Sequence, residues 1–194
     1  MSKKINNNSK FCKREGENLE FFSEKKIKVK SLLTPGEHGV EKGRYSDFGL
    51  LLRTKQKIKR YYCIYEKQFK LIYKKISKKI FNYENFINIL ERRLDNLVYR
   101  MNFSISRKEA RQYIVHGFVF VNFKKINYPS YVLSPGDSIF IKNNFLFKKF
   151  NYDFKNFFNL NWIYLNYLKG FGILISLPNK NKFYFDKNLI LDLY

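Results

Sequence analysis

Acidic residues are scarce in this chain of 194 residues, which has 16 Asp and Glu against 38 Lys and Arg. No apolar run approaches the ~18 residues that identify a membrane-spanning helix. No apolar stretch follows Met1 in the manner of a signal peptide either. We therefore expect neither a membrane span nor a leader. The length predicts one or two domains. The 45% of hydrophobic residues suffices for a buried core, which excludes a wholly disordered chain.

Cysteine and histidine are nearly absent. Cys12 and Cys63 are far apart and form no CxxC pair, whereas a zinc site needs about four closely spaced ligands. His38 and His116 are isolated as well. We therefore expect reduced thiols, no metal, no cofactor and no catalytic histidine.

The formal net charge of +22 is the dominant property of the composition. Such a surplus repels itself within a compact chain, so it indicates a polyanionic partner, and nucleic acid is the first candidate. A bias toward AT-rich codons explains why Lys outnumbers Arg, but it does not explain why acids are so few. Residues 1–80 hold 22 of the basic and 8 of the acidic side chains, so this segment is the expected main electrostatic anchor.

Apolar residues at spacings of three and four predict a long helix from about 48 to 80, preceded by Ser46 and Asp47. The lysines off this stripe form either a solvated face or a basic surface along phosphates. They are Lys55, Lys59, Lys67, Lys70, Lys74, Lys75 and Lys78.

A second helix is predicted over about 83–101, with its arginines directed away from the buried face. A third runs from Arg107 to about residue 116. The pattern from Ser106 to Glu109 fits a capping box at its start, and Gly117 fits a left-handed cap at its end. The first turn of this third helix combines free backbone N–H groups and the positive end of the helix dipole with the basic residues Arg107, Lys108 and Arg111. It therefore suits the binding of a phosphate.

After Gly117 the apolar period changes to two. Strands are predicted over 118–121, 131–133 and 138–141, with turns at 122–125 and 134–137. Two helices and this small meander make one compact unit over about 84–142. Further strand candidates are 162–165, 171–175 and 189–191.

One stretch of about fifty residues resembles a known family. It begins with ERRLDNLVYRM at 91–101 and continues with Ser106-Arg107, Ala110-Arg111-Gln112, His116-Gly117, Val121-Asn122, Pro129-Ser130-Tyr131 and Pro135-Gly136-Asp137. This pattern resembles the RNA-binding domain named after small-subunit ribosomal protein S-four. Because that domain also occurs in pseudouridine synthases, some aminoacyl-tRNA synthetases and heat-shock RNA binders, the flanking sequence has to identify the protein class.

The flanks resemble the ribosomal family itself. On the N-terminal side the matching segments are CKREGE at 12–17, PGEHG at 35–39, SDFG at 46–49, LRTKQK at 52–57 and YEKQF at 65–69. On the C-terminal side they are WIYL at 162–165, LKG at 168–170, LP at 177–178 and residues 188–194. Nearly the whole chain is covered, except about 143–160.

The resemblance implies an α+β fold. A mainly helical N-terminal domain takes residues 1–83, and an inserted RNA-binding domain of two helices and a small antiparallel sheet takes 84–142. Residues 143–194 are a linker and a C-terminal segment that packs back on the N-terminal domain. The resemblance further implies a non-catalytic, primary binder of small-subunit rRNA at a junction in the 5′ domain. Such a protein nucleates assembly of the subunit body and influences translational accuracy.

The implied partners are small-subunit rRNA, ribosomal protein S-five, other small-subunit proteins and mRNA near its entrance, with no membrane. The mRNA cluster maps to Lys42 and Arg44. The rRNA-facing residues in the first domain map to Arg14, Arg53, Lys55, Lys57 and Arg60. In the inserted domain they map to Arg92, Arg93, Arg100, Arg107, Lys108, Arg111, Gln112, His116 and Asn122.

Four features depart from the family pattern. The cysteines of zinc-holding members are missing apart from Cys12. Phe123 replaces the glycine of an Asn-Gly hairpin, which predicts another turn type because phenylalanine is strained at positive φ. Glu41 stands where a base is common, which weakens a role in unwinding mRNA. The phenylalanines of 143–160 are expected in a core or a protein interface rather than stacked on bases.

Two other functions stay open on the residues alone: an RNA-modifying enzyme, which would need a separate catalytic domain, and a free RNA-binding stress factor. The compartment is open too. The composition favours an organellar ribosome, with a plastid such as an apicoplast first. A mitochondrion and the cytoplasm of an AT-rich bacterium are the alternatives.

Overall fold

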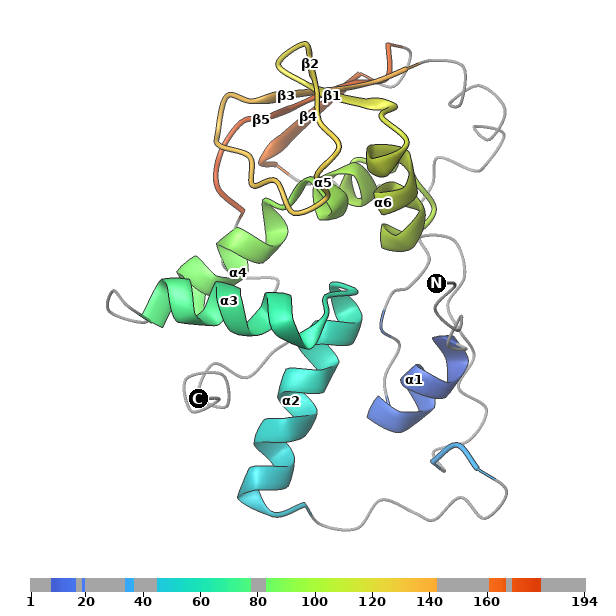
Figure 1. The fold of residues 1–194 in the computed structure, drawn as a ribbon, viewed down its shortest axis with the longest axis vertical. Helices are drawn as coiled ribbons and strands as arrows, with labels where there is room; N and C mark the ends of the chain where they lie inside the picture. The colour runs from blue at the N-terminus through green and yellow to red at the C-terminus, as the bar shows by residue number, and fades with distance from the viewer. Residues whose placement is uncertain are drawn as a thin grey trace. The chain divides into compact units, whose positions relative to one another are not determined.

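A computed structural model describes residues 8–16, 19, 34–36, 45–77, 83–142, 161–166 and 169–178. The chain divides into two compact units, which separate between Lys75 and Ile76. The described residues form six helices and one antiparallel sheet of five strands (Figure 1), so the predicted α+β class is confirmed. Among the described helices, none has the length and apolar character needed to cross a lipid bilayer.

Three helices build the first unit: α1 (Asn8–Glu15), α2 (Asp47–Tyr61) and α3 (Glu66–Ser77), whose last residues pass into the second. Helix α2 begins where the sequence predicts. The Ser46 hydroxyl accepts a hydrogen bond from the Gly49 N–H at 3.2 Å, which satisfies one of the free donors of the first turn.

The predicted single helix over 48–80 is wrong, because the chain turns between α2 and α3. Cys63 adopts φ of 54°, in the left-handed region. The Cys63 N–H donates to the Arg60 carbonyl at 3.1 Å, and the Ile64 N–H donates to the Lys59 carbonyl at 2.8 Å. This pair of bonds is a Schellman motif, which satisfies the last carbonyls of α2. The apolar period continues through the turn, so periodicity alone could not reveal it.

The predicted helix over 83–101 is also divided, into α4 (Tyr83–Glu91) and α5 (Leu94–Arg100). At the break, Arg93 forms a β-bridge with Val132. The Leu94 N–H donates to the carbonyl of Tyr131 at 2.7 Å, which occupies a donor that would otherwise continue the helix. The loop over 126–137 therefore sets the boundary between the two helices.

Helix α6 (Arg107–Val115) follows its sequence signals closely. The Ser106 hydroxyl accepts from the Glu109 N–H at 3.2 Å, as predicted. The Glu109 carboxylate reaches the N–H of Ile105 at 2.7 Å, one residue earlier than the expected capping box. Gly117 ends the helix with φ of 74°, which confirms the predicted left-handed cap.

The sheet belongs to the second unit, and its strands follow the order β2-β1-β3-β5-β4, all antiparallel. The strands are β1 (Val119–Val121), β2 (Lys124–Lys125), β3 (Ser138–Ile141), β4 (Ile163–Asn166) and β5 (Phe171–Leu174). The strand predicted at 131–133 is reduced to the single bridge at Val132. The strand candidate at 189–191 lies outside the described residues, as does the phenylalanine-rich segment 143–160.

Strands β4 and β5 belong to the second unit and complete its sheet. β5 pairs with β3, with Gly172 opposite Ile139, so residues 163–174 extend the sheet of the predicted inserted domain. The physical reason is burial. Trp162, Ile163 and Leu174 join the same apolar core as α5, α6 and the meander.

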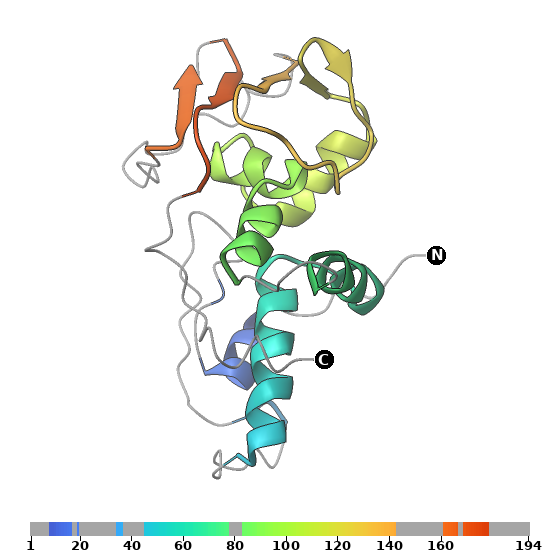
Figure 2. The same ribbon diagram turned by 90° about the vertical axis from the view of Figure 1, so that its left-hand side faces the viewer.

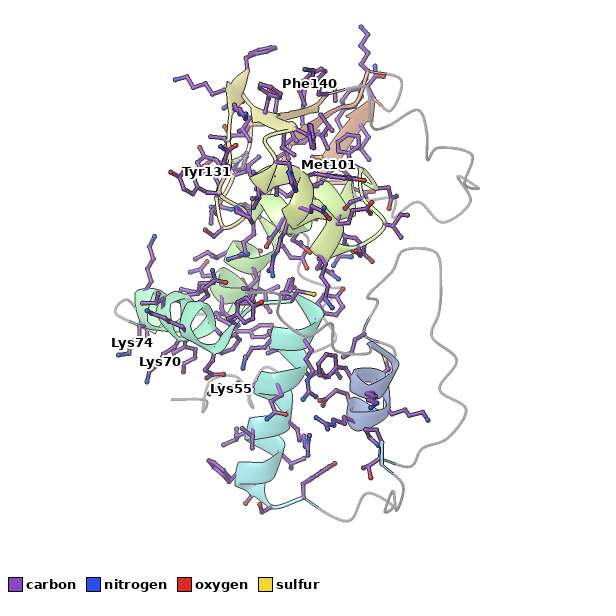
Figure 3. All side chains as sticks on the ribbon, turned by 45° about the vertical axis from the view of Figure 1, so that its right-hand side comes forward. Lys55, Lys70, Lys74, Met101, Tyr131 and Phe140 are labelled. Atoms are coloured by element: carbon purple, nitrogen blue, oxygen red, sulfur yellow. The ribbon has the colours of Figure 1, made fainter. Side chains whose placement is uncertain are left out.

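This core lies between the sheet and helices α5 and α6, which cover one face of it (Figures 1 and 2). Leu97, Met101, Ile114 and Leu174 are fully buried there. The packing is close at β5. A Cβ at Gly172 would lie 2.7 Å from the sulfur of Met101, which lies between the helices and the sheet (Figure 3).

Replacement of Gly172 by valine is expected to destabilise the second unit by about 1–3 kcal/mol, because extra atoms in a packed core force side chains off their rotamers. Urea unfolding followed by the fluorescence of Trp162, the only tryptophan, measures this loss. Combining Gly172→Val with Met101→Ala should cost less than the sum of the two single changes. Strictly additive losses of stability would contradict a contact between position 172 and Met101.

Candidate nucleic-acid interface

Two buried carboxylates organise the arginines of the second unit. Glu91, the last residue of α4, is 1% exposed, and Asp95, in the first turn of α5, is 2% exposed. A buried carboxylate is costly unless it is paired and hydrogen-bonded. Both meet that condition, because arginines from α5, α6 and the link between α4 and α5 surround them.

Asp95 holds two arginines at once. The Arg93 guanidinium binds it through two bonds, Nε to Oδ1 at 3.1 Å and Nη2 to Oδ2 at 2.9 Å. Arg111 of α6 donates from Nε to Oδ2 at 2.8 Å. The Arg93 side chain is 4% exposed and that of Arg111 is 21% exposed. Asp95 therefore fixes the direction in which the more exposed Arg111 points.

Glu91 begins a second set of contacts. Arg100 donates to its two oxygens at 3.1 and 3.0 Å. The Asn96 amide donates to the same carboxylate at 2.8 Å, and its oxygen accepts from the Nε of Arg107 at 2.8 Å. The Arg107 guanidinium also lies over the ring of Tyr99, 4.3 Å from the centroid. These contacts tie α4, α5 and α6 together.

Arg93 does not project away from the buried face as the sequence predicts, and Arg107, expected to face RNA from the first turn of α6, is buried too. They are 3% and 2% exposed. The carboxylate of Asp95 and the amide of Asn96 draw them inward, since an ionised side chain is buried only where a partner compensates its lost hydration. Arg92 is half-buried, and its carbonyl accepts from the N–H of Leu133 at 3.0 Å.

The network around Glu91 and Asp95 is positive overall. It joins Arg93, Arg100, Arg107 and Arg111 to two carboxylates. A surplus of charge that is partly removed from water favours an anion at the open side. Arg100 and Arg111 are the members that retain exposure.

The open face of α6 carries most of the exposed polar side chains predicted to meet RNA. Lys108, Gln112 and His116 are exposed at spacings of four, and Arg111 stands beside them. The imidazole of His116 stacks on Phe118 with the ring centroids 6.1 Å apart. Since Lys108 lies in the first turn, it adds its charge to the positive end of the helix dipole.

The side chain of Asn122 makes hydrogen bonds within the protein. Its amide oxygen accepts from the N–H of Ser138 at 2.9 Å, and its amide nitrogen donates to Asp137 at 2.8 Å. The expectation of a different turn type is wrong, because Asn122 and Phe123 have φ of 48° and 64°. Two left-handed residues are the requirement of a type I′ hairpin.

In the first unit, Arg60 connects α2 to α1. Its guanidinium pairs with Glu15 and lies over the ring of Phe11 at 4.9 Å. Burial lowers the pKa of Arg60 from its ordinary value, and the charge of nearby Arg14 lowers it further. Arg14 itself is exposed. The two arginines therefore raise the local positive potential.

Three more predicted residues lie along α2. Arg53 lies over the ring of Tyr45 at 5.8 Å, and Lys57 is half-buried. Lys55 pairs with Glu66 of α3 at 2.6 Å. Lys42 and Arg44 lie outside the described residues.

The lysines of α3 that lie off the apolar stripe are exposed, and the side chains of Lys70 and Lys74 extend from the helix (Figure 3). The buried residues of the same helix are Phe69, Tyr73 and Ile76. Helix α3 is therefore amphipathic, with one apolar and one basic side.

The two free cysteines lie in or beside a small buried cluster of the first unit. Burial raises the pKa of the Cys12 thiol, against a smaller opposing effect of a hydrogen bond with the backbone of Leu19. Cys63 packs against the small cluster formed by Cys12 and Leu19. Across the described part of the chain, no three His, Cys, Asp or Glu side chains come together to hold a metal ion.

Sequence reasoning missed the roles of Glu91, Asp95 and Asn96. The available signal was composition, since two of the chain's few acids lie within five residues of Arg92 and Arg93. In a strongly basic segment, an acid beside arginines is a candidate for a buried partner rather than for a solvated charge.

Two family profiles match the chain and together cover most of it. Residues 3–91 match the ribosomal protein S4/S9 N-terminal domain, and residues 92–139 match the S4 domain. The boundary between the matches falls at the break between α4 and α5.

Individual relatives agree with these matches. The chain is 64% identical to small ribosomal subunit protein uS4 of Carsonella ruddii over the full length of both chains. It is 39% identical to the uS4 protein of Hahella chejuensis over 100% of this chain and 99% of the relative. The uS4 protein of Halothermothrix orenii is 37% identical over 95% of each chain.

Proposed function

This chain belongs to the family of small ribosomal subunit protein uS4, and on that premise we propose that it grips a junction of rRNA helices through two basic surfaces, one in each compact unit. The family is one of structural ribosomal proteins and not of enzymes. The chain is therefore a structural, rRNA-binding component of the small ribosomal subunit. The alternatives of an RNA-modifying enzyme and a free stress factor are not favoured by these relatives.

The observation that carries the proposal is the open face of α6 above the buried arginine network. Lys108, Arg111, Gln112 and His116 would meet phosphates and 2′-hydroxyls, with Arg100 beside them. Specificity would then come from the shape of the junction, because the deep major groove of an RNA helix hides the base edges.

Arg93, Arg107 and Asn122 would act as positioning residues in this interface. Each uses its polar side chain within the protein: Arg93 on Asp95, Arg107 on Asn96, and Asn122 on the 134–138 turn. Their rotamers are fixed before RNA arrives. This lowers the entropy that binding must otherwise remove.

The second proposed surface is in the first unit. It comprises Arg14, Arg53, Lys55, Lys57 and Arg60, supported by the exposed lysines of α3. Lys55 and Arg60 have acidic partners, Glu66 and Glu15, so a phosphate would share or replace these contacts. In the second unit, Arg92 is proposed as a further contact with rRNA.

The finer roles follow from the family resemblance and stay proposals. They are primary binding in the 5′ domain, nucleation of body assembly, an influence on accuracy through a contact with ribosomal protein S-five, and an mRNA contact by Lys42 and Arg44. We also propose the inserted-domain organisation, with a first boundary near 83 and with β4 and β5 added to the predicted 84–142 unit. The high positive charge supports early rRNA binding, because it accelerates association with a polyanion.

Of the three compartments left open, the relatives support a bacterial cytoplasm. Carsonella ruddii, which supplies a relative 64% identical over the whole chain, is a bacterial symbiont. A plastid or apicoplast, favoured on composition, has no support from these relatives, and neither has a mitochondrion.

Lys108→Ala is expected to weaken binding of the full chain to a small-subunit 5′-domain rRNA fragment and to lower the salt slope by about one, the value for one phosphate contact. The loss should be similar for all RNAs that bind, because a phosphate contact carries no sequence information. Filter binding over a salt series measures both quantities.

Lys169→Ala is the charge-matched control. Lys169 is exposed between β4 and β5, at the opposite edge of the sheet from β2. We expect it to leave the slope unchanged. Equal slopes for the wild type and Lys108→Ala would remove the α6 face from the interface.

A further inference from the structure

We infer that the β1–β2 hairpin inserts Phe123 against an unpaired base of the bound RNA, as a stacking contact in addition to the phosphate contacts of α6. The inference rests on the proposed function, since it names a further contact with the same RNA. Phe123 is 89% exposed, the highest value among the exposed large hydrophobic residues of the described chain. It stands at a hairpin tip, where no neighbouring side chain of the hairpin covers it.

The backbone at Phe123 is unfavourable for this residue. Its φ of 64° lies in the left-handed region, which glycine adopts freely and a bulky aromatic residue rarely does. An exposed aromatic ring at such a position contributes neither core packing nor turn stability. A strained residue that gives the fold nothing is a candidate for a contact with a partner.

The tip is also held rigidly. Asn122, which precedes Phe123, is fixed by Ser138 and Asp137 through both groups of its amide. On the other side, β2 pairs with β1, with Lys124 opposite Val121. A contact residue on a fixed support loses little entropy on binding.

Charge favours RNA as the occupant. Lys124 and Lys125 follow Phe123 directly and are both exposed, and the segment 119–133 contains no acidic residue. An aromatic ring flanked by cations suits a base and its phosphates, because the ring can stack while the lysines neutralise the backbone. A hydrophobic pocket on a protein would instead favour aliphatic neighbours around the ring.

The hairpin continues from the proposed RNA face. Gly117 joins the end of α6 to β1, and a Cβ at Gly117 would overlap the side chain of Lys125. The side chain of Lys125 therefore lies against Gly117, just beyond the C-terminal end of α6. In Figures 1 and 2 the hairpin of β1 and β2 lies at the outer edge of the second unit, where β2 is the end strand of the sheet.

The test compares Phe123→Gly, Phe123→Leu and Phe123→Tyr in the full chain, by filter binding to the 5′-domain rRNA fragment. We expect about tenfold weaker binding for the glycine and leucine variants, within the range found for loss of one base–aromatic stack. The tyrosine variant should bind within about twofold of the wild type. The salt slope should stay unchanged for all three, because no charge is removed.

Stability separates binding from folding. Phe123→Gly relieves the positive-φ strain, so its unfolding midpoint should rise or stay equal while its affinity falls. Chemical probing of the RNA should show one base protected by the wild type and the tyrosine variant and reactive with the glycine variant. If the Phe123→Leu variant bound the RNA with the affinity of the wild type, this result would contradict stacking of the Phe123 ring on a base.

Wild-type affinity in the glycine variant would overturn the inference, while a reduced salt slope for Lys108→Ala would still support the proposed function. If the glycine variant binds RNA normally but loses a neighbouring protein from reconstituted subunits, Phe123 contacts protein and the inference is wrong. If the wild type fails to bind the fragment, the proposed function itself fails.

Discussion

Replacing Asp95 by asparagine is expected to lower the free energy of unfolding of the second unit by about 3–5 kcal/mol, the usual cost of removing one partner of a buried ion pair. Asparagine keeps the size of the side chain but removes its charge. Arg93, whose side chain is 4% exposed, would then remain as a buried cation without its bidentate partner. Urea unfolding followed by the fluorescence of buried Trp162 reports on this unit directly.

The double variant Arg93→Met, Asp95→Asn tests the explanation. Removing both charges takes away the uncompensated cation, so this variant should recover part of the loss. Arg111 still loses its acceptor at Asp95, so recovery should be incomplete. A loss of less than about 1 kcal/mol in the single variant, as for an exposed ion pair, would contradict a structural role for Asp95.

Local signals explain what the sequence could predict. The start of α6 is set by Ser106 and Glu109, and its end by Gly117, which lie within a few residues of the backbone groups they satisfy. The start of α2 at Ser46 is of the same kind. Such contacts depend only on neighbouring residues, so their pattern is visible in the sequence.

The helix boundaries that were wrong depend on distant or hidden contacts. The break between α4 and α5 requires the 126–137 loop, whose carbonyl at Tyr131 accepts from the N–H of Leu94. The break after α2 uses Cys63 in a left-handed conformation, where a glycine or asparagine would have been the expected signal. The pairing of β5 with β3 is equally nonlocal, since more than twenty residues separate the strands.

The arginines show the same limit within the interface. Sequence spacing directed Arg93 away from the buried face, and the first turn of α6 and the family resemblance placed Arg107 toward RNA, yet the structure buries both. Spacing gives the direction of a helical side chain only while the helix continues, and Arg93 lies at a break. A buried acid is also invisible to amphipathic patterns, because those patterns assign every charge to the solvent side.

Raising monovalent salt from about 50 to 200 mM, at constant Mg²⁺, is expected to weaken binding of the full chain to the rRNA fragment by about 10³–10⁵-fold. This range corresponds to about six to ten phosphate contacts under the duplex-DNA relation. The exposed and half-exposed charged candidates in the described residues fall within this range; they are Arg14, Arg53, Lys55, Lys57, Arg60, Arg92, Arg100, Lys108 and Arg111. Filter binding across the series gives the slope.

The slope also discriminates between contact and positioning roles. Arg93 is bound to Asp95 and its side chain is only 4% exposed, so it should add little to the salt slope, unlike the more exposed Arg100 and Arg111. An unrelated RNA duplex should show a similarly steep slope at lower affinity, because phosphate contacts are shared while the junction shape is not. A slope that corresponds to fewer than about three contacts would contradict two basic surfaces acting together. Such a result would leave the net charge of +22 without a role in holding rRNA.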